Sequence, residues 1–266
     1  MRYYLVLQPS LGHSFGPERS AWLDATLSQD RYDPAGTLGE TGRHLVTNEE
    51  VTFGQLTVRY EQGLSGGDHW QATLGSNWLR QGRPDPDRWR RLTQQDRFVN
   101  TTYRLALGRT DWIEGSLEVR TQNITYTVDS PDYKEDATVG TVGARYEATF
   151  GAYQGGVQLN LARYNAVGRF ARKLMLDTRL HLARALGSVE ADLGWNVIAE
   201  RFTEPNPDYG DARLKQTLRS WTLDVIWPMF RSLSAAVQLR RDDRSANVAT
   251  AAYRNESLSL SLIHVY

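Results

Sequence analysis

The sequence predicts one antiparallel up-and-down transmembrane β-barrel of about 14 strands, with 12 and 16 as alternatives, formed by residues 1–266. Three observations support this all-β fold. Apolar and polar residues alternate along most of the chain, short and long connections alternate between these segments, and aromatic residues gather near the segment ends. A period of two is that of a strand with one apolar and one polar face. The alternative fold is a soluble β-sandwich, whose apolar faces pack a core instead of meeting lipid.

Thirteen segments of the chain show the alternating pattern. In the segment at 188–202, for example, Val189, Ala191 and Leu193 alternate with Glu190 and Asp192. The expected strands, in chain order, are 2–14, 19–31, 49–62, 68–81, 95–108, 111–127, 136–150, 153–166, 169–185, 188–202, 214–229, 232–245 and 252–266. Most are long enough to cross a bilayer at a tilt. Because bacterial single-chain barrels have an even strand number, we expect either a further strand before Met1, with or without an upstream periplasmic domain, or one missed segment.

The connections between these segments fall into two sets. One set is tight, as at 64–68, 150–154 and 185–188. The other is mostly longer and more polar, at 33–48, 81–95, 129–137 and 203–213, with shorter members near 166–169 and 246–251. Short turns at one end and long loops at the other are typical of an outer-membrane barrel, with the turns on the periplasmic side.

Composition excludes several function classes. The formal net charge of +0 argues against nucleic-acid binding, and the absence of cysteine excludes disulfides and thiolate catalysis. No apolar run is long enough for a transmembrane helix, and the first residues do not form a signal peptide. The five histidines show no catalytic or metal-binding spacing, and we expect His181 to be a structural neighbour of Asp177 and Arg179. We therefore expect no enzyme activity, no cofactor and no metal.

Charged residues recur in the middle of the polar faces. If the apolar faces meet lipid, these charges line a water-filled lumen. The predicted lumen-lining residues are Arg59, Arg104, Glu118, Arg120, Arg145, Asp177, Arg179, Asp192, Asp224, Arg240 and Asp242. A charged ladder of Arg240, Asp242 and Arg244 with Arg254 and Glu256 is also expected there. A lumen of mixed sign suits polar or zwitterionic cargo better than one selected ion.

Aromatic residues predict two bands at the membrane interfaces, where an amphipathic ring has an apolar and a wet neighbour. The band near the short turns comprises Trp112, Phe150, Tyr153, Trp227, Phe230 and Tyr266. The band near the longer loops comprises Trp78, Tyr126, Tyr164, Phe202 and Tyr253.

The last residues, "SLSLSLIHVY", form a strand that ends on an aromatic residue. In this respect they resemble the C-terminal signal that the barrel assembly machinery recognises, although His264 departs from the usual apolar residue. We expect this strand to pair with the first strand, because an open sheet edge in lipid leaves backbone groups unsatisfied.

The stretch "LRRDDRSANVATAAYRNESLSLSLIHVY" (239–266) resembles the last hairpin of barrels that follow periplasmic tetratricopeptide domains. These are exopolysaccharide exporters and surface lipoprotein assembly modulators. The resemblance covers about a tenth of the chain. It implies a barrel of about 14 to 16 strands that passes a polymer or a lipoprotein outward, with an upstream domain or partner in the periplasm.

The expected function is therefore an outer-membrane conduit that exports a polar macromolecule, most simply an exopolysaccharide. A general diffusion porin, a barrel that sheathes a partner protein and an outer-membrane lipid hydrolase are the alternatives. The expected partners are outer-membrane lipid and lipopolysaccharide, which the basic run at 80–91 could also contact, and the assembly machinery.

Overall fold

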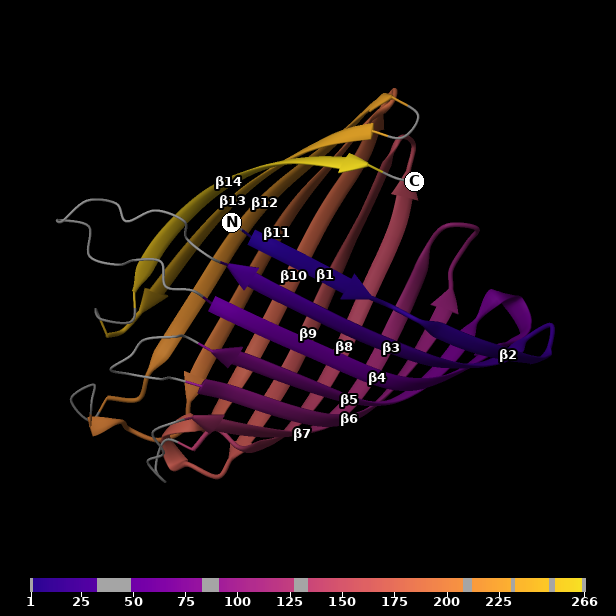
Figure 1. Ribbon diagram of the computed structural model, residues 1–266. Helices are drawn as coiled ribbons and strands as arrows, with labels where there is room; N and C mark the ends of the chain where they lie inside the picture. Colours follow the sequence, from indigo (N-terminus) through magenta and orange to yellow (C-terminus); the bar gives the residue numbers. More distant parts are fainter. Residues whose placement is uncertain are drawn as a thin grey trace.

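The computed structural model describes residues 2–32, 49–82, 91–126, 134–207, 212–230, 233–248 and 252–264. They form one antiparallel sheet of 14 strands, in which consecutive strands are neighbours almost throughout (Figure 1). The predicted all-β, up-and-down fold is confirmed. The strands are β1 (Arg2–Leu7), β2 (Ser10–Gly16), β3 (Arg19–Tyr32), β4 (Glu49–Gly63), β5 (His69–Gly82), β6 (Arg91–Ala106), β7 (Trp112–Tyr126), β8 (Ala137–Phe150), β9 (Tyr153–Ala166), β10 (Lys173–Leu186), β11 (Val189–Phe202), β12 (Lys215–Phe230), β13 (Leu233–Ala246) and β14 (Tyr253–His264).

The first expected strand is divided into two at Pro9. Proline has no backbone N–H, so it cannot donate a hydrogen bond to a ladder. Both β1 and β2 pair with β3, and the register continues across the break from Leu7↔Leu27 to Ser10↔Asp24. The Pro9 carbonyl still accepts a hydrogen bond from Ala25 N at 3.0 Å. Two of the 14 strands, β1 and β2, are therefore consecutive segments that both pair with β3.

Turn geometry agrees with the predicted difference between the two ends. At one end, β8 and β9 are joined across Gly151, and β10 and β11 across Gly187. These glycines have φ of 66° and 65°, a left-handed conformation that residues with a Cβ adopt at a cost. At the other end, the connection between β9 and β10 contains the 3₁₀ turn η3 (Arg169–Ala171). The predicted loop at 33–48 lies outside the described residues.

The sheet is curled, and its two faces differ in character. Large apolar side chains are exposed on its convex face, among them Leu74, Leu117 and Leu260, the last with 73% of its surface accessible. No large side chain in the described residues is fully buried. A contiguous apolar surface on this scale marks contact with another apolar phase, which for a barrel is lipid.

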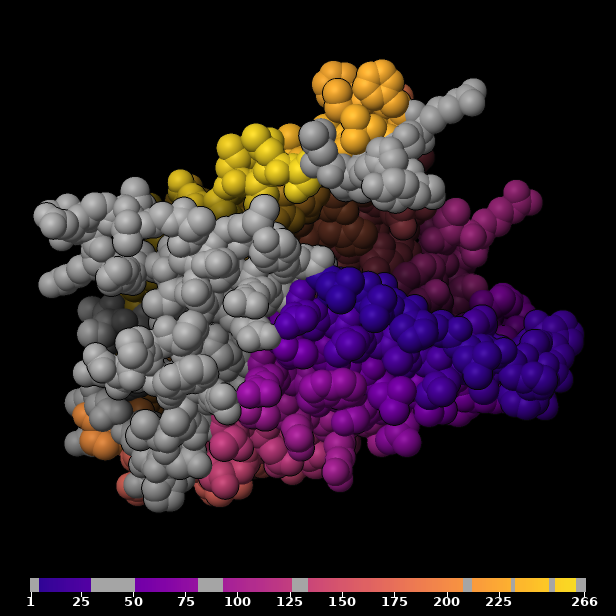
Figure 2. All heavy atoms as spheres, in the orientation of Figure 1, coloured from indigo at the N-terminus to yellow at the C-terminus, as the bar shows by residue number. Residues whose placement is uncertain are grey.

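The two edges of the sheet are β14 on one side and β1 with β2 on the other (Figure 1). The expected pairing of the last strand with the first is not among the ladders of the described residues. Figure 2 shows the molecule hollowed between the indigo N-terminal strands and the yellow C-terminal strands, with strands from the middle of the chain behind the hollow. No described helix is long and apolar enough to cross a membrane.

Candidate functional site

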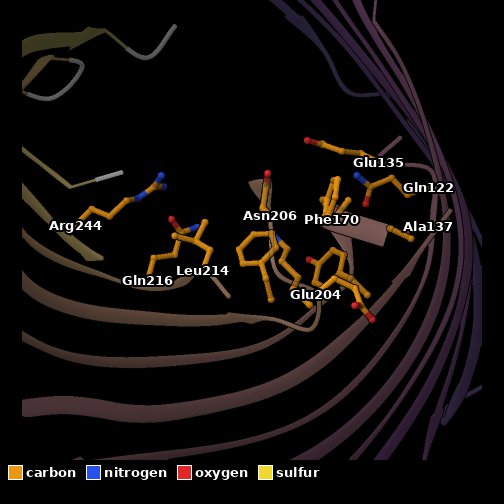
Figure 3. Close-up of a pocket in the computed structure, with 14 residues that line it drawn as sticks. Gln122, Glu135, Ala137, Phe170, Glu204, Asn206, Leu214, Gln216 and Arg244 are labelled. Carbon is orange, nitrogen blue, oxygen red and sulfur yellow. The ribbon is translucent and has the colours of Figure 1, made fainter. Parts of the chain in front are cut away.

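The concave face of the sheet carries the predicted lumen residues. Figure 3 shows Gln122 and Arg244 on this side of the wall. Residues two apart on a strand point to the same face, so Arg120 lies on the concave face with Gln122, and Asp242 lies there with Arg244. The register partners of these residues on the neighbouring strands lie on the concave face too. All eleven belong to this face: Arg59, Arg104, Glu118, Arg120, Arg145, Asp177, Arg179, Asp192, Asp224, Arg240 and Asp242. Their contact with water in a lumen stays a prediction.

Most charges on the concave face are paired along a single strand, between residues two apart. Arg145 Nη2 lies 2.8 Å from Glu147 Oε1, and Arg179 Nη2 lies 2.8 Å from Asp177 Oδ2. In each pair the carboxylate is buried and the guanidinium projects: the exposed fractions are 4% for Glu147 against 43% for Arg145, and 6% for Asp177 against 57% for Arg179. The longer arginine therefore presents its cation to the interior, above a shielded acid.

Two further clusters also pair an arginine with an acid two residues away, and they reach across strands. Arg120 contacts Glu118 on its own strand at 2.8 Å and the buried Asp96 of β6 at 3.5 Å. Arg59 contacts Glu61 at 3.1 Å and Asp24 of β3 at 3.4 Å. The concave wall is thus lined by ion pairs, with charges of both signs close together.

Trp112 lies between two of these arginines. Its ring centre is 4.0 Å from the Arg104 guanidinium and 5.2 Å from that of Arg145, and Arg104 also donates to Glu114 at 2.9 Å. Trp112 was expected in an interface band, and the structure places its ring on the concave face. Its register partner is Glu147, a concave-face residue, so the ring points inward and stacks on cations.

Glu147 is at the centre of a polar network on this wall. His181 Nε2 is 2.9 Å from both of its carboxylate oxygens, and His181 Nδ1 is 4.0 Å from Asp192. The sequence placed His181 beside Asp177 and Arg179 on one strand, whereas its partner lies 34 residues earlier. The Glu147 carboxylate fills the space that a Cβ on Gly156 would occupy.

A cavity of about 500 Å³ lies at the loop end of the concave face (Figure 3). Its apolar part is formed by Phe170 of η3 and Leu214, both buried, together with Ala137 and Ala166. Its polar part comprises Gln122, Glu135, Lys173, Glu204, Asn206, Gln216 and Arg244. Leu214 O accepts a hydrogen bond from Phe202 N at 3.0 Å, which extends the ladder of β11 and β12 by one residue beyond Arg201↔Lys215.

Aromatic and cationic groups meet in this cavity. Lys173 Nζ lies 5.0 Å from the Tyr164 ring centre and 5.4 Å from that of Phe202, and it pairs with Glu200. Tyr164 and Phe202 were expected in an interface band, but their register partner is Lys173 of the concave face. Phe170 was not singled out by the sequence. The strand expected at 169–185 begins only at Lys173, and Phe170 lies in the 3₁₀ turn before it.

Arg244 carries an unsatisfied donor at the rim of the cavity. Its Nε is buried without a hydrogen-bond partner among the described residues, while its guanidinium lies 4.8 Å from the Tyr253 ring centre. The described residues contain no group of three or more His, Asp or Glu that could hold a metal. The cavity can therefore offer ring faces, amides and charges of both signs to a polar molecule.

Other predicted interface aromatics lie at the turn end of the sheet. Phe150, Tyr153, Trp227 and Phe230 are all exposed there, and Tyr266 lies outside the described residues. Their contact with a membrane interface stays a prediction.

The expected ladder of Arg240 and Asp242 with residues of the last strand is corrected by the register. Glu256 is opposite Arg241, with the two charged groups 3.6 Å apart, and Arg254 is 3.1 Å from Asp243. These pairs lie on the convex face, because Arg241 and Asp243 are an odd number of residues from Arg240 and Asp242.

One sheet with an apolar convex face and a charged concave face defines the wall of a membrane β-barrel of the outer-membrane type. The expected fold class, an all-β sheet of the outer-membrane barrel type, is confirmed. No family model matches the chain, and no curated protein matches it.

Solved structures do resemble it. The FrpB iron transporter of Neisseria meningitidis (F3-3 variant) aligns with a TM-score of 0.56 at 10% identity, over 100% of this chain and 57% of that one. The apoprotein form of its F5-1 variant aligns with a TM-score of 0.52 at 11% identity, over 97% of this chain and 56% of that one. The chain thus spans a little over half of their length, and the likeness is one of fold. The resemblance to tetratricopeptide-linked exporters stays a prediction from residues 239–266.

Proposed function

We propose that the chain forms the wall of an outer-membrane transport conduit for polar cargo and carries out no covalent chemistry. The observation that carries this proposal is the concave wall of buried carboxylates beneath projecting arginines, opposite an apolar convex face. Paired charges of both signs offer a polar molecule many weak contacts. They lower the cost of removing water from it without holding it tightly.

The cargo class that the loop-end cavity favours is a carbohydrate chain, as in an exopolysaccharide. Ring faces of Phe170, Tyr164 and Phe202 lie beside amide groups of Gln122 and Gln216. Aromatic faces pack on the apolar faces of sugar rings, and amides hydrogen-bond to hydroxyl groups. Sites with few fixed polar groups and several rings orient such ligands.

Single-channel conductance of the detergent-refolded chain in a planar bilayer tests the proposal. We expect steady ohmic steps that a neutral maltose-series oligosaccharide interrupts. Phe170→Ala should lower the oligosaccharide affinity that these interruptions report by about 2- to 10-fold, since each ring contact contributes modestly. Val142→Ala, on the exposed convex face, is the matched control and should leave it unchanged. Insertion without conductance would contradict the conduit and favour a partner sheath or an enzyme.

A second candidate cargo, an iron complex, is favoured by the two structural neighbours, which are iron transporters. Ferric citrate in the same bilayer assay separates the two. Interruption of the current by ferric citrate, but not by the oligosaccharide, would favour uptake of an iron complex.

A further inference from the structure

The convex face changes character along its length. Its middle band is apolar, whereas toward the loops cationic side chains replace the leucines on the same face. On β11 to β14 these are Arg201, Lys215, Arg219, Arg241 and Arg254. We call these five residues the convex basic cluster; all five are exposed. Two carboxylates, Asp243 and Glu256, lie among these five cations, so this part of the convex face has a net charge of +3.

The cluster continues around the sheet at a similar distance from the loops. Arg80, Arg97 and Arg163 lie on the same face of β5, β6 and β9 and are also exposed. This face therefore presents a cationic belt next to its apolar band.

Arg201 and Lys215 are directly opposite each other in the ladder of β11 and β12. Like charges in that position repel and destabilise the pair of strands. No described carboxylate lies within ion-pair distance of either side chain, unlike Arg241 and Arg254, which have Glu256 and Asp243. An anion placed between Arg201 and Lys215 would remove this repulsion.

A groove of about 500 Å³ connects these two cations to the apolar band. Leu161, Leu174, Leu176 and Ala199 line its apolar part, and the hydroxyl-bearing Thr217 and Ser245 lie at the cationic end. A second groove, of about 540 Å³, repeats the arrangement: Trp221, Leu239 and Leu258 line it, and Arg241 and Glu256 lie at its edge.

We propose that this surface binds the phosphorylated, acylated saccharide of lipopolysaccharide in the outer leaflet. A phosphate group bridges Arg201 and Lys215, the saccharide hydroxyls reach Thr217 and Ser245, and acyl chains lie along the leucines of the two grooves. Charged hydrogen bonds to phosphate are the strong class of such contacts, and arginine matches phosphate geometry. The inference rests on the orientation in which the long loops face outward, and it is independent of the cargo of the conduit.

The experiment measures binding of purified diphosphoryl lipid A to the refolded full chain in detergent, by native mass spectrometry at increasing lipid concentration. We expect saturable binding that Arg201→Gln combined with Lys215→Gln weakens by about 10- to 100-fold. Arg184→Gln is the matched control, because Arg184 is a convex-face cation at the turn end. It should bind lipid A like the unaltered chain.

Two comparison ligands show which chemistry is recognised. Dephosphorylated lipid A should bind at least about 10-fold more weakly, because the charged contacts are lost. Phosphatidylglycerol binding as tightly as lipid A would overturn the proposal, since attraction to any anionic lipid would then explain it. Equal lipid A binding by the double variant would overturn it too, provided that the variant keeps the heat-dependent gel mobility of a folded barrel. Conductance should be the same for all these variants, so a failure here is distinguishable from failure of the conduit.

Discussion

At the scale of single residues, the concave wall depends on the size difference between acidic and basic side chains. Aspartate and glutamate stay close to the backbone, as Asp177 does, whereas arginine extends past them. In these pairs the cation projects into the interior and the acid beneath balances its charge. Removing one acid would leave an arginine without its partner, at a larger cost than losing an exposed pair.

Gly156 is required by the position of Glu147. A Cβ at residue 156 would overlap the Glu147 carboxylate, which Arg145 and His181 hold in place. We expect Gly156→Ala to destabilise the folded chain by about 1–3 kcal/mol, because overpacking displaces this network.

Urea unfolding in lipid vesicles measures the effect. The matched control is Gly140→Ala on β8, where nothing lies within 4 Å of the added methyl group. The control should change the free energy of unfolding by less than about 0.5 kcal/mol. Equal effects of the two substitutions would show that the Glu147 network is not rigid.

At the scale of elements, each strand separates two environments by its period of two. On β11, Asp192 belongs to the concave face and Leu193 to the convex face, where it is exposed. The same parity holds along β7, where Val119 is exposed next to the partly buried Arg120. A one-residue shift in register would exchange the two sets.

Cysteine labelling tests this assignment, and the chain has no native cysteine to interfere. In lipid vesicles, Asp192→Cys should react readily with a membrane-impermeant maleimide, because its side chain faces water. Leu193→Cys and Leu260→Cys, surrounded by lipid, should react slowly. Arg59, Arg104, Arg120, Arg145, Arg179, Asp224 and Arg240 are further positions expected to react. Similar rates at both kinds of position would disprove the lumen assignment.

At the scale of the whole molecule, the exposed apolar face determines the solvent in which the chain folds. Transferring this surface from water to lipid or detergent is favourable, at roughly 25 cal/mol for each Å² of apolar area. We expect the denatured chain to recover its β-sheet circular dichroism and heat-dependent gel mobility only when detergent or lipid is added. A folded monomer in plain buffer would instead support the soluble β-sandwich.

Much of this fold could be predicted because strand periodicity is local. The segment expected at 153–166 is β9, Tyr153–Ala166, and that expected at 188–202 is β11, Val189–Phe202. Proline chemistry, also local, would have predicted the break at Pro9. Parity within each strand placed all eleven charged residues on one face.

The site was less predictable, because its contacts cross strands. Glu147 meets His181 only through the registers of β8, β9 and β10. Trp112, Tyr164 and Phe202 lie at strand ends, where an aromatic residue suits an interface or a polar interior equally well. The register partners of these rings on the adjacent strands place them on the concave face.

The sequence by itself determined that this protein is built of long two-faced strands joined by alternating short and long connections, because a period of two depends only on neighbouring residues. The tertiary structure decided which charges meet, which rings form the cavity with Phe170, and where Arg201 opposes Lys215. The physical reason is that each such contact joins residues far apart in sequence, and its geometry follows from the register of every strand between them.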